Sequence, residues 1–187
     1  MIAGKLGKTT KIMARKTMIE CVESQTARKF FEENHIQGFV GGIEYIALKT
    51  GDEIVAMMSF GRPRFNKSYD YELLRFANKL STTVVGGFSK LLKHFMSRNS
   101  GTIVSYADRS RSNGNVYIKN GFELVSTTEP GYGYTDGECL YSRHEFQKHK
   151  LESKLKVYDA GLTEEENMFA NKYRKYFDCG QLVFQIG

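Results

Sequence analysis

The chain of 187 residues has no tryptophan, two prolines, three cysteines and no long apolar run. Without about 18 consecutive apolar residues, a membrane-spanning helix is not expected. The basic N-terminus lacks the continuous apolar stretch of a secretory signal. We therefore expect an intracellular, cytoplasmic protein with a flexible basic arm at residues 1–15 and one domain over residues 16–187.

The cysteines Cys21, Cys139 and Cys179 are far apart and odd in number. No two of them have the close spacing of a zinc knuckle, and a disulfide framework is not expected. The four histidines form no HxxxH pair. The sequence therefore predicts buried free thiols and no metal site.

Positive charge is concentrated in one part of the chain. Between Gly61 and Arg98 there are eight basic residues and two acidic ones. Such clustering attracts a polyanion or an anionic cofactor. A solubilising surface is the alternative.

The stretch Tyr71–Arg98 has the pattern of a phosphate-binding strand, turn and helix. Leu73–Ala77 predicts a strand, Asn78–Thr83 a polar turn, and the residues after Gly86-Gly87 an amphipathic helix. A glycine pair at a helix entrance leaves backbone N–H groups uncovered, and the helix dipole adds positive potential. The turn therefore predicts a seat for phosphate.

The other segments predict alternating strands and helices, with Ser24 as a helix N-cap and a hairpin turn around Gly51. The expected strands are Lys16–Val22, Ile43–Leu48, Glu53–Gly61, Thr102–Ala107, the segment from Phe122, Glu138–Ser142 and Gln181–Ile186; the expected helices are Ser24–Asn34, Gly114–Asn120, Phe146–Leu151 and Leu162–Phe177; Pro130–Asp136 is expected to be a loop. This order predicts an α/β fold with a mixed sheet and a βαβ unit. Ligands of such units bind at the carboxyl ends of the strands.

Element order and two motifs resemble the GNAT acyltransferase superfamily. Members carry R/Q-x-x-G-x-G/A before the helix that follows the fourth strand, and this chain reads Thr83-Val84-Val85-Gly86-Gly87-Phe88. Gly86 matches the first glycine, Thr83 replaces the basic or amide residue, and Phe88 replaces the second small residue. The resemblance implies a GNAT-like, mostly antiparallel central sheet with flanking helices. It also implies binding of acetyl-CoA or another acyl-CoA, with pyrophosphate contacts at Val85, Gly86, Gly87, Phe88 and Ser89.

The second motif is Tyr117-x-Lys119-x-Gly121-Phe122, which matches the family pattern in full over this half. The resemblance implies that Tyr117 protonates the departing thiolate. A neutral phenol with a pKa of about 10 can donate a proton to a basic leaving group. The alternative is a tyrosine that packs at a helix end.

Three residues are candidate general bases because of their positions. Glu72 and Asp108 lie in or just after strands of the βαβ unit, and His35 lies at a helix exit. Each has a structural alternative: Glu72 pairs with Arg75 or Arg62, Asp108 caps a turn, and His35 is a structural hydrogen-bonding residue.

Several segments, among them FGRPRFN, GGFSKL and YIKNGF, resemble a narrower group of bacteriophage proteins. That group includes domains that follow nuclease modules in homing-endonuclease-like proteins, and it is distantly similar to the Mom-type DNA-modifying enzymes. The resemblance implies DNA modification in the host cytoplasm. The alternative is a catalytically inactive module of this fold that binds nucleic acid and accompanies a nuclease.

A nucleic-acid acceptor would require positive loops and exposed aromatic rings. The expected basic contacts are Arg62, Arg64, Lys67, Arg109 and Arg111, and the expected stacking residues are Phe65, Tyr132 and Tyr134. Because coenzyme A is itself anionic, these loops alone do not identify DNA as the partner.

Overall fold

A computed structural model describes residues 7–187, which form two compact units. Unit 1 contains residues 7–106, 114–126 and 183–187, and unit 2 contains residues 107–113 and 127–182. The part of the expected arm at residues 1–6 lies outside the described residues. In the range that the structure covers, every helix is too short or too polar to cross a membrane.

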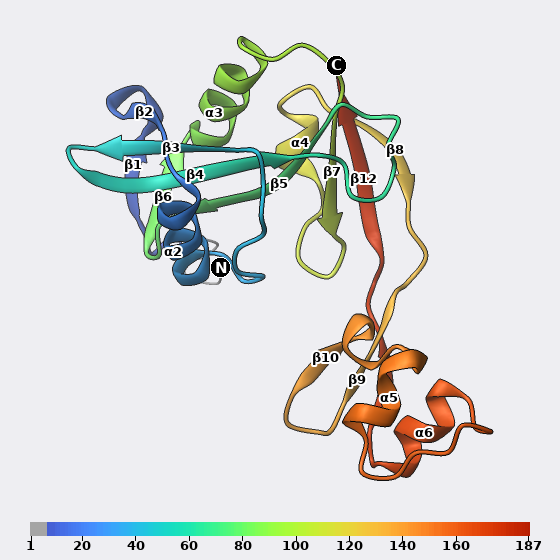
Figure 1. Ribbon diagram of the computed structural model, residues 1–187. Coiled ribbons are helices and arrows are strands. Elements are labelled where there is room, and N and C mark those ends of the chain that lie inside the picture. The colour runs from blue at the N-terminus through green and yellow to red at the C-terminus, as the bar shows by residue number, and fades with distance from the viewer. Residues whose placement is uncertain (1–6) are drawn as a thin grey trace. The chain divides into compact units, whose positions relative to one another are not determined.

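Seven strands form the main sheet, most of which belongs to unit 1 (Figure 1). Their spatial order is β2 (Met18–Cys21), β3 (Glu44–Thr50), β4 (Glu53–Gly61), β5 (Tyr71–Asn78), β7 (Ile103–Asp108), β12 (Gln181–Ile186) and β8 (Glu123–Thr127). The pairs β2–β3, β3–β4 and β4–β5 are antiparallel, and β5–β7 is parallel. The expected mixed, mostly antiparallel sheet is therefore confirmed.

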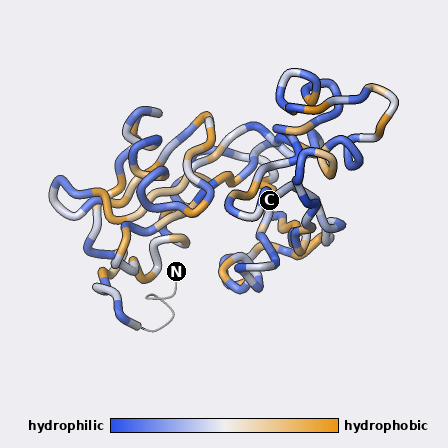
Figure 2. Tube along the Cα trace, turned by 90° about the horizontal axis from the view of Figure 1, so that it is seen from below, coloured by the Kyte–Doolittle hydropathy of each residue, from blue (hydrophilic) through white to orange (hydrophobic). Residues whose placement is uncertain are grey.

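Two helices cover opposite faces of this sheet (Figure 1). Helix α2 (Ser24–Asn34) buries Ala27, Phe30 and Phe31, the face expected from the sequence spacing. Helix α3 (Gly87–Met96) packs on the other face, where the rings of Phe95 and Phe60 stack. Because both faces are covered, β4 is buried along nearly its whole length. Hydrophobic and hydrophilic residues alternate repeatedly along the chain (Figure 2).

Two short strands replace segments that were expected to be irregular. Strand β1 (Thr10–Met13) lies in the expected flexible arm, and β6 (Thr82–Val85) overlaps the expected turn. They pair in parallel, with Thr10 opposite Thr82 and Met13 opposite Val85. Most residues of the two strands are exposed or half-buried, and each strand is only four residues long. Their pairing joins distant segments, so a local pattern does not predict it.

Other boundaries also differ from the expectation. Glu23, not Ser24, is the N-cap residue of α2. The expected Pro130–Asp136 loop contains strand β9 (Tyr132–Thr135), and the expected Leu162–Phe177 helix is divided into α6 (Glu164–Ala170) and β11 (Arg174–Phe177). Lys172 has a φ of 69°, which a right-handed helix does not allow.

The expectation of buried thiols is wrong. Cys21, Cys139 and Cys179 are all free, and all three are exposed. Each lies near the end of a strand or in a loop, where the neighbouring residues do not cover it.

Unit 2 has a small core of its own. Strands β10 (Leu140–Ser142), β9 and β11 form a three-stranded sheet next to the 3₁₀ helix η2 (Arg143–Phe146), α5 (Lys148–Lys154) and α6. Tyr134, Phe146, Leu151 and Met168 are buried together in this core.

The short helix α4 (Asn115–Ile118) requires a glycine at its start. Gly114 has a φ of 77°, and a Cβ atom there would lie 2.2 Å from Cζ of Phe184. Phe184 in turn stacks on Tyr117 of α4, with ring centroids 4.8 Å apart. The glycine therefore sets the position of the Tyr117 ring.

Gly114→Ala should lower the free energy of unfolding by about 3 kcal/mol, because it combines left-handed strain with overpacking. Chemical denaturation measures this loss. Gly51→Ala is the matched control, since Gly51 also has a positive φ (58°) but no atom within 4 Å of an added Cβ. That variant should lose only about 1 kcal/mol. Equal losses in the two variants would contradict the packing role of Gly114.

Candidate functional site

Strands β5 and β7 stop pairing before either strand ends. Their parallel register covers Tyr71–Leu73 and Ile103–Ser105, although β5 continues to Asn78 and β7 to Asp108. On the other side of β5, the register with β4 shifts between Ser59 and Phe60. Such an irregularity bends a strand and redirects its side chains. Beyond Leu73, β5 has no pairing with β7 in the register that the structure shows.

The Tyr117 hydroxyl lies at the last residue pair of this parallel ladder. Ser105 Oγ is 3.1 Å from Tyr117 Oη and 3.1 Å from the Leu73 carbonyl oxygen. Burial raises the pKa of Tyr117, while the hydrogen bond with Ser105 and the charge of Arg75 oppose this rise. The phenol is therefore protonated at neutral pH.

The entrance of α3 has the geometry expected for a phosphate seat. Gly86 is left-handed, with a φ of 78°, and the first helical hydrogen bond runs from the Lys90 N–H to the Gly86 carbonyl. The N–H groups of Gly87, Phe88 and Ser89 therefore have no partner within the helix. Val85 belongs to β6, where it pairs with Met13.

The Phe88 side chain turns into the core and away from this seat. It is 6% exposed, and its ring makes edge contacts with Phe76 of β5 and Tyr117 of α4. Phe88 can therefore offer a ligand only its backbone N–H.

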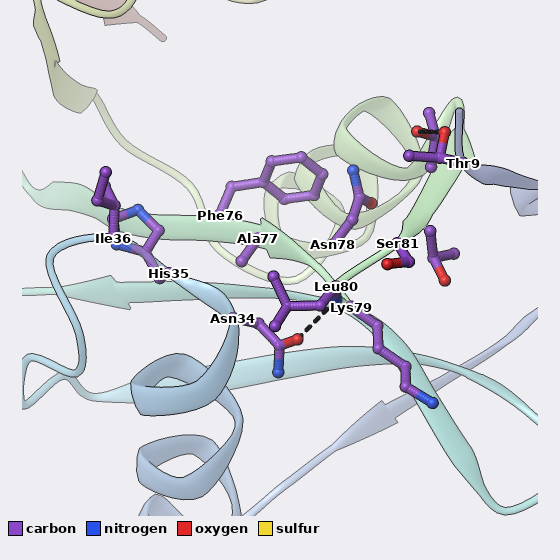
Figure 3. Close-up of a pocket in the computed structure, with 12 residues that line it drawn as sticks. Thr9, Asn34, His35, Ile36, Phe76, Ala77, Asn78, Lys79, Leu80 and Ser81 are labelled. Carbon is purple, nitrogen blue, oxygen red and sulfur yellow. Dashed lines mark hydrogen bonds between the residues drawn. The ribbon is translucent and has the colours of Figure 1, made fainter. Parts of the chain in front are cut away.

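A cleft of about 330 Å³ lies along the carboxyl end of β5 (Figure 3). Its lining runs from Thr9 and Thr83 past Phe76 to His35. The Thr9 and Thr83 hydroxyls lie 2.8 Å apart and share a hydrogen bond. One end of the cleft is thus at the start of the β1–β6 pair, and the other is at the exit of α2.

No protein-family model and no curated protein sequence matches this chain. Solved structures do match it. The ribosomal-protein-S18-alanine N-acetyltransferase from Escherichia coli has a TM-score of 0.54 at 13% identity, covering 91% of this chain and 92% of that one. An acetyltransferase from Bacillus subtilis in complex with CoA has a TM-score of 0.52 at 13% identity, over 91% and 98% of the two chains. The yncA protein of Salmonella typhimurium with acetyl-CoA has a TM-score of 0.52 at 10% identity, over 91% and 93%.

The fold is that of the GNAT acetyltransferases. Similarity at 10–13% identity shows that the chains share a fold. The contacts of each residue within this GNAT-like fold indicate what that residue can do.

His35 lies at the C-cap of α2 and lines the cleft (Figure 3). Its Nδ1 accepts a hydrogen bond from the Gln37 N–H at 3.1 Å. Burial, and then the charge of Arg75, lower the pKa of His35 to about 4. The neutral ring therefore carries its proton on Nε2, which makes it a hydrogen-bond donor.

Glu72 is 1% exposed and is fully engaged by one arginine. Its Oε2 accepts a hydrogen bond from the Arg64 N–H at 2.8 Å, and its Oε1 accepts hydrogen bonds from Arg64 Nε at 3.0 Å and Nη2 at 2.6 Å. The partner of Glu72 is thus Arg64, not the expected Arg75 or Arg62. The Arg64 side chain therefore already forms an ion pair within the protein.

Asp108, Arg109 and Arg111 lie together in unit 2. Asp108 Oδ1 accepts hydrogen bonds from the Ser110 N–H and hydroxyl, and its Oδ2 is 3.3 Å from Arg111 Nε. Arg109 donates a hydrogen bond to the Cys179 carbonyl oxygen. The turn-capping alternative for Asp108 is therefore present in the structure.

The other expected nucleic-acid contacts differ in their exposure. Arg62 and Lys67 are exposed, and Lys67 donates a hydrogen bond to the Pro63 carbonyl oxygen. Phe65 is 69% exposed, but Tyr134 is 1% exposed, so stacking by Tyr134 is excluded by its burial in the core of unit 2. Tyr132 is half-buried, with Arg143 and Lys175 over its ring.

Two residues of this region, Ser105 and Arg75, were not predicted from the sequence to belong to the site. Ser105 is a polar residue inside the apolar TIVSYA strand, which was a visible but weak signal. The sequence indicates Arg75 only as a partner of Glu72, but in the structure its hydrogen bonds go to the Gly38 and Leu74 carbonyl oxygens.

Arg64→Gln should cost more stability than Glu72→Gln, although both break the same pair. Removal of Arg64 leaves a buried carboxylate without its cation, a loss of about 3–5 kcal/mol. In Glu72→Gln the remaining Arg64 side chain is 41% exposed and can be hydrated, so we expect about 1–2 kcal/mol.

Urea denaturation of the two variants measures this difference. Lys79→Gln, which breaks the exposed pair with Glu53, is the control and should cost at most about 1 kcal/mol. A smaller loss in Arg64→Gln than in Glu72→Gln would show that Glu72 is not effectively buried.

Proposed function

We propose that this protein is an acyl-CoA-dependent N-acyltransferase whose acceptor is a nucleic-acid base. The observation that carries the proposal is the position of the Tyr117 hydroxyl beside Ser105 and Leu73, where the β5–β7 pairing ends. The GNAT-like fold and the neighbours solved with CoA or acetyl-CoA support the choice of donor.

The first turn of α3 is the proposed seat of the coenzyme A pyrophosphate. The N–H groups of Gly87, Phe88 and Ser89 would donate hydrogen bonds to its oxygens, and the helix dipole favours the negative charge. Gly86 allows the left-handed turn that presents these groups. Val85, already paired in β6, would border the seat.

Transfer requires the acceptor amine to attack the thioester carbonyl, after which the C–S bond breaks and the thiolate takes a proton. We assign that proton to Tyr117, which burial keeps protonated at neutral pH. The Ser105 hydroxyl has one proton to donate, to either Leu73 or Tyr117, so it can stabilise the phenolate that forms.

The acceptor nitrogen must also lose a proton. The exocyclic amine of a nucleobase is uncharged at neutral pH and can attack without prior deprotonation, so its proton leaves later. In unit 1 the proposed general base is Glu72, which would first have to separate from Arg64. In unit 2 the proposed general base is Asp108. His35, as an Nε2–H donor, is better suited to hold an acceptor oxygen.

The choice of a nucleic-acid acceptor rests on the loop after β4. The exposed Phe65 is in the same loop as the exposed cations Arg62 and Lys67, and rings of this kind stack on unpaired bases. A base within a duplex would have to be flipped out first. We also propose a relation to bacteriophage DNA-modifying proteins, whose FGRPRFN-like segment corresponds to this loop.

A catalytically inactive module that binds nucleic acid is the second candidate. Two observations favour it: Thr83 replaces the usual basic or amide residue and is hydrogen-bonded to Thr9, and the bulky Phe88 replaces a small residue. Such a module would bind DNA but would not bind acetyl-CoA.

Isothermal titration with acetyl-CoA should detect binding with a dissociation constant below about 1 mM. Tyr117→Phe should leave that constant nearly unchanged, because the hydroxyl serves the leaving group. It should lower the rate of thiol release in the presence of amine acceptors by about 10²-fold.

Tyr71→Phe is the matched control for this experiment, since Tyr71 packs on Phe95 within the fold. Its rate should equal that of the unmodified protein. Failure of acetyl-CoA to bind at millimolar concentration would exclude the enzyme and favour the binding module. Binding without any rate difference between the two variants would exclude Tyr117 as the acid.

Binding to a fluorescent single-stranded oligonucleotide should weaken with salt, and an Arg62→Gln, Lys67→Gln double variant should reduce the salt slope by about 2. Arg64 is left unchanged, because its removal would unpair Glu72. The control is Lys29→Gln, Lys93→Gln, which removes the same charge from exposed helix positions. Equal slopes in both double variants would contradict a nucleic-acid surface at this loop.

A further inference from the structure

The sheet face under α2 becomes more polar toward one end of its strands. Ala47, Met57 and Ala77 are neighbours across β3, β4 and β5, and they form part of the apolar core with α2. Two residues further along, the cross-strand neighbours are Tyr45, Ser59 and Arg75. Directly opposite side chains leave a sheet on the same face. This second row lies toward the segment that follows α2, since Arg75 donates a hydrogen bond to Gly38 and Tyr45 contacts Gly42.

Arg75 is a partly buried cation without a carboxylate partner. Its Nε donates a hydrogen bond to the Gly38 carbonyl oxygen at 3.2 Å, and Nη1 to the Leu74 carbonyl oxygen at 2.9 Å. No ion pair of Arg75 is formed within residues 7–187. The adjacent carboxylate, Glu72, is already taken by Arg64. One guanidinium nitrogen, Nη2, therefore keeps its hydrogen-bonding capacity.

A second polar group in the row has no hydrogen-bond partner within residues 7–187. Ser59 is fully buried, and its Oγ forms no hydrogen bond with any other described residue. A buried hydroxyl without a partner is unusual in a folded protein. Because Ser59 lies directly opposite Arg75, two polar side chains on adjacent strands have unused hydrogen-bonding capacity.

The charge of Arg75 affects both a residue of the cleft, His35, and the proposed acid, Tyr117. It lowers the pKa of His35, which lines the cleft, and it opposes the rise in the pKa of Tyr117. Burial, and then the charge of Arg64, lower the pKa of Arg75 itself, yet a guanidinium remains protonated in proteins. An anion between the cleft and Tyr117 would thus meet a preformed positive potential.

We propose that Arg75 binds an oxyanion of the acceptor, a phosphate or a carboxylate group. This inference rests on the proposed function, since it names the class of acceptor for the same site. Paired with such a group, Nη2 would make the charge-assisted hydrogen bond that the protein leaves unmade. A phosphate next to the acylated base and a carboxylate of a small amine both meet this requirement.

The test is an NMR titration of the ¹⁵N-labelled full chain with inorganic phosphate and, separately, with acetate. Chloride at matched ionic strength is the reference. We expect saturable shifts of the Arg75 Nε–H and the Gly38 and Ser59 amides, with a dissociation constant on the order of 1 mM. Saturation by phosphate alone would identify the anion as phosphate, and saturation by acetate alone would identify a carboxylate.

Arg75→Gln should weaken anion binding about tenfold or more, and Arg75→Lys should retain part of it. Arg174→Gln is the matched control, because Arg174 is exposed and also donates its hydrogen bonds to backbone carbonyl oxygens, and this variant should not change these shifts. Shifts confined to the α3 entrance, or shifts at Ser59 that persist in Arg75→Gln, would overturn the proposal. If Arg75→Gln does not fold, the unmodified protein provides the test: saturable shifts centred on Arg75, Gly38 and Ser59 support the proposal, and shifts elsewhere contradict it.

The outcome is independent of coenzyme A. If acetyl-CoA does not bind, the proposed transferase activity is excluded, but an anion site at Arg75 would still be detected. If acetyl-CoA binds and the Arg75 signals do not shift with either anion, only the oxyanion site is excluded.

Discussion

The loss of pairing between β5 and β7 after Leu73 and Ser105 is the constraint on which the candidate site depends. Continued pairing would satisfy the backbone groups that follow Leu73 within the ladder. Instead, the ladder ends beside the Tyr117 hydroxyl, and the register shift next to Ser59 bends β5 on its other edge. Phe88 then links the bent strand to α4 through edge contacts with Phe76 and Tyr117. One interruption of the sheet thus determines the surroundings of the proposed acid.

Local periodicity was enough to predict the parts of the fold that have an apolar face. The α2 face of Ala27, Phe30 and Phe31, the hairpin around Gly51, and the helix after Gly86 all follow from spacing within one segment. The pairing of β1 with β6 could not be predicted, because those strands carry little apolar pattern. The exposure of the cysteines was missed for a related reason: it depends on neighbours brought in from elsewhere.

The partners of charged residues were harder to predict than the elements that carry them. The positive stretch between Gly61 and Arg98 suggested a large free surface, but much of it is used within the protein. Arg64 holds Glu72, Lys79 pairs with Glu53, and Arg98 pairs with Glu44. Lys90 donates hydrogen bonds to the Ala14 and Thr17 carbonyl oxygens. Composition gives the number of cations, whereas only the tertiary structure shows which of them remain for a ligand.

The pairing of β1 with β6 also affects the order in which the molecule can be completed. Thr9 and Thr83, whose hydroxyls share a hydrogen bond, are 74 positions apart in the chain. Contacts of such long range form slowly, because a large loop must close before they contribute any stability. Helix α3 can form early from its local apolar pattern, whereas β6, which precedes Gly86, can pair only after β1 has reached it. The β1–β6 pair is therefore expected to be among the last parts of unit 1 to form.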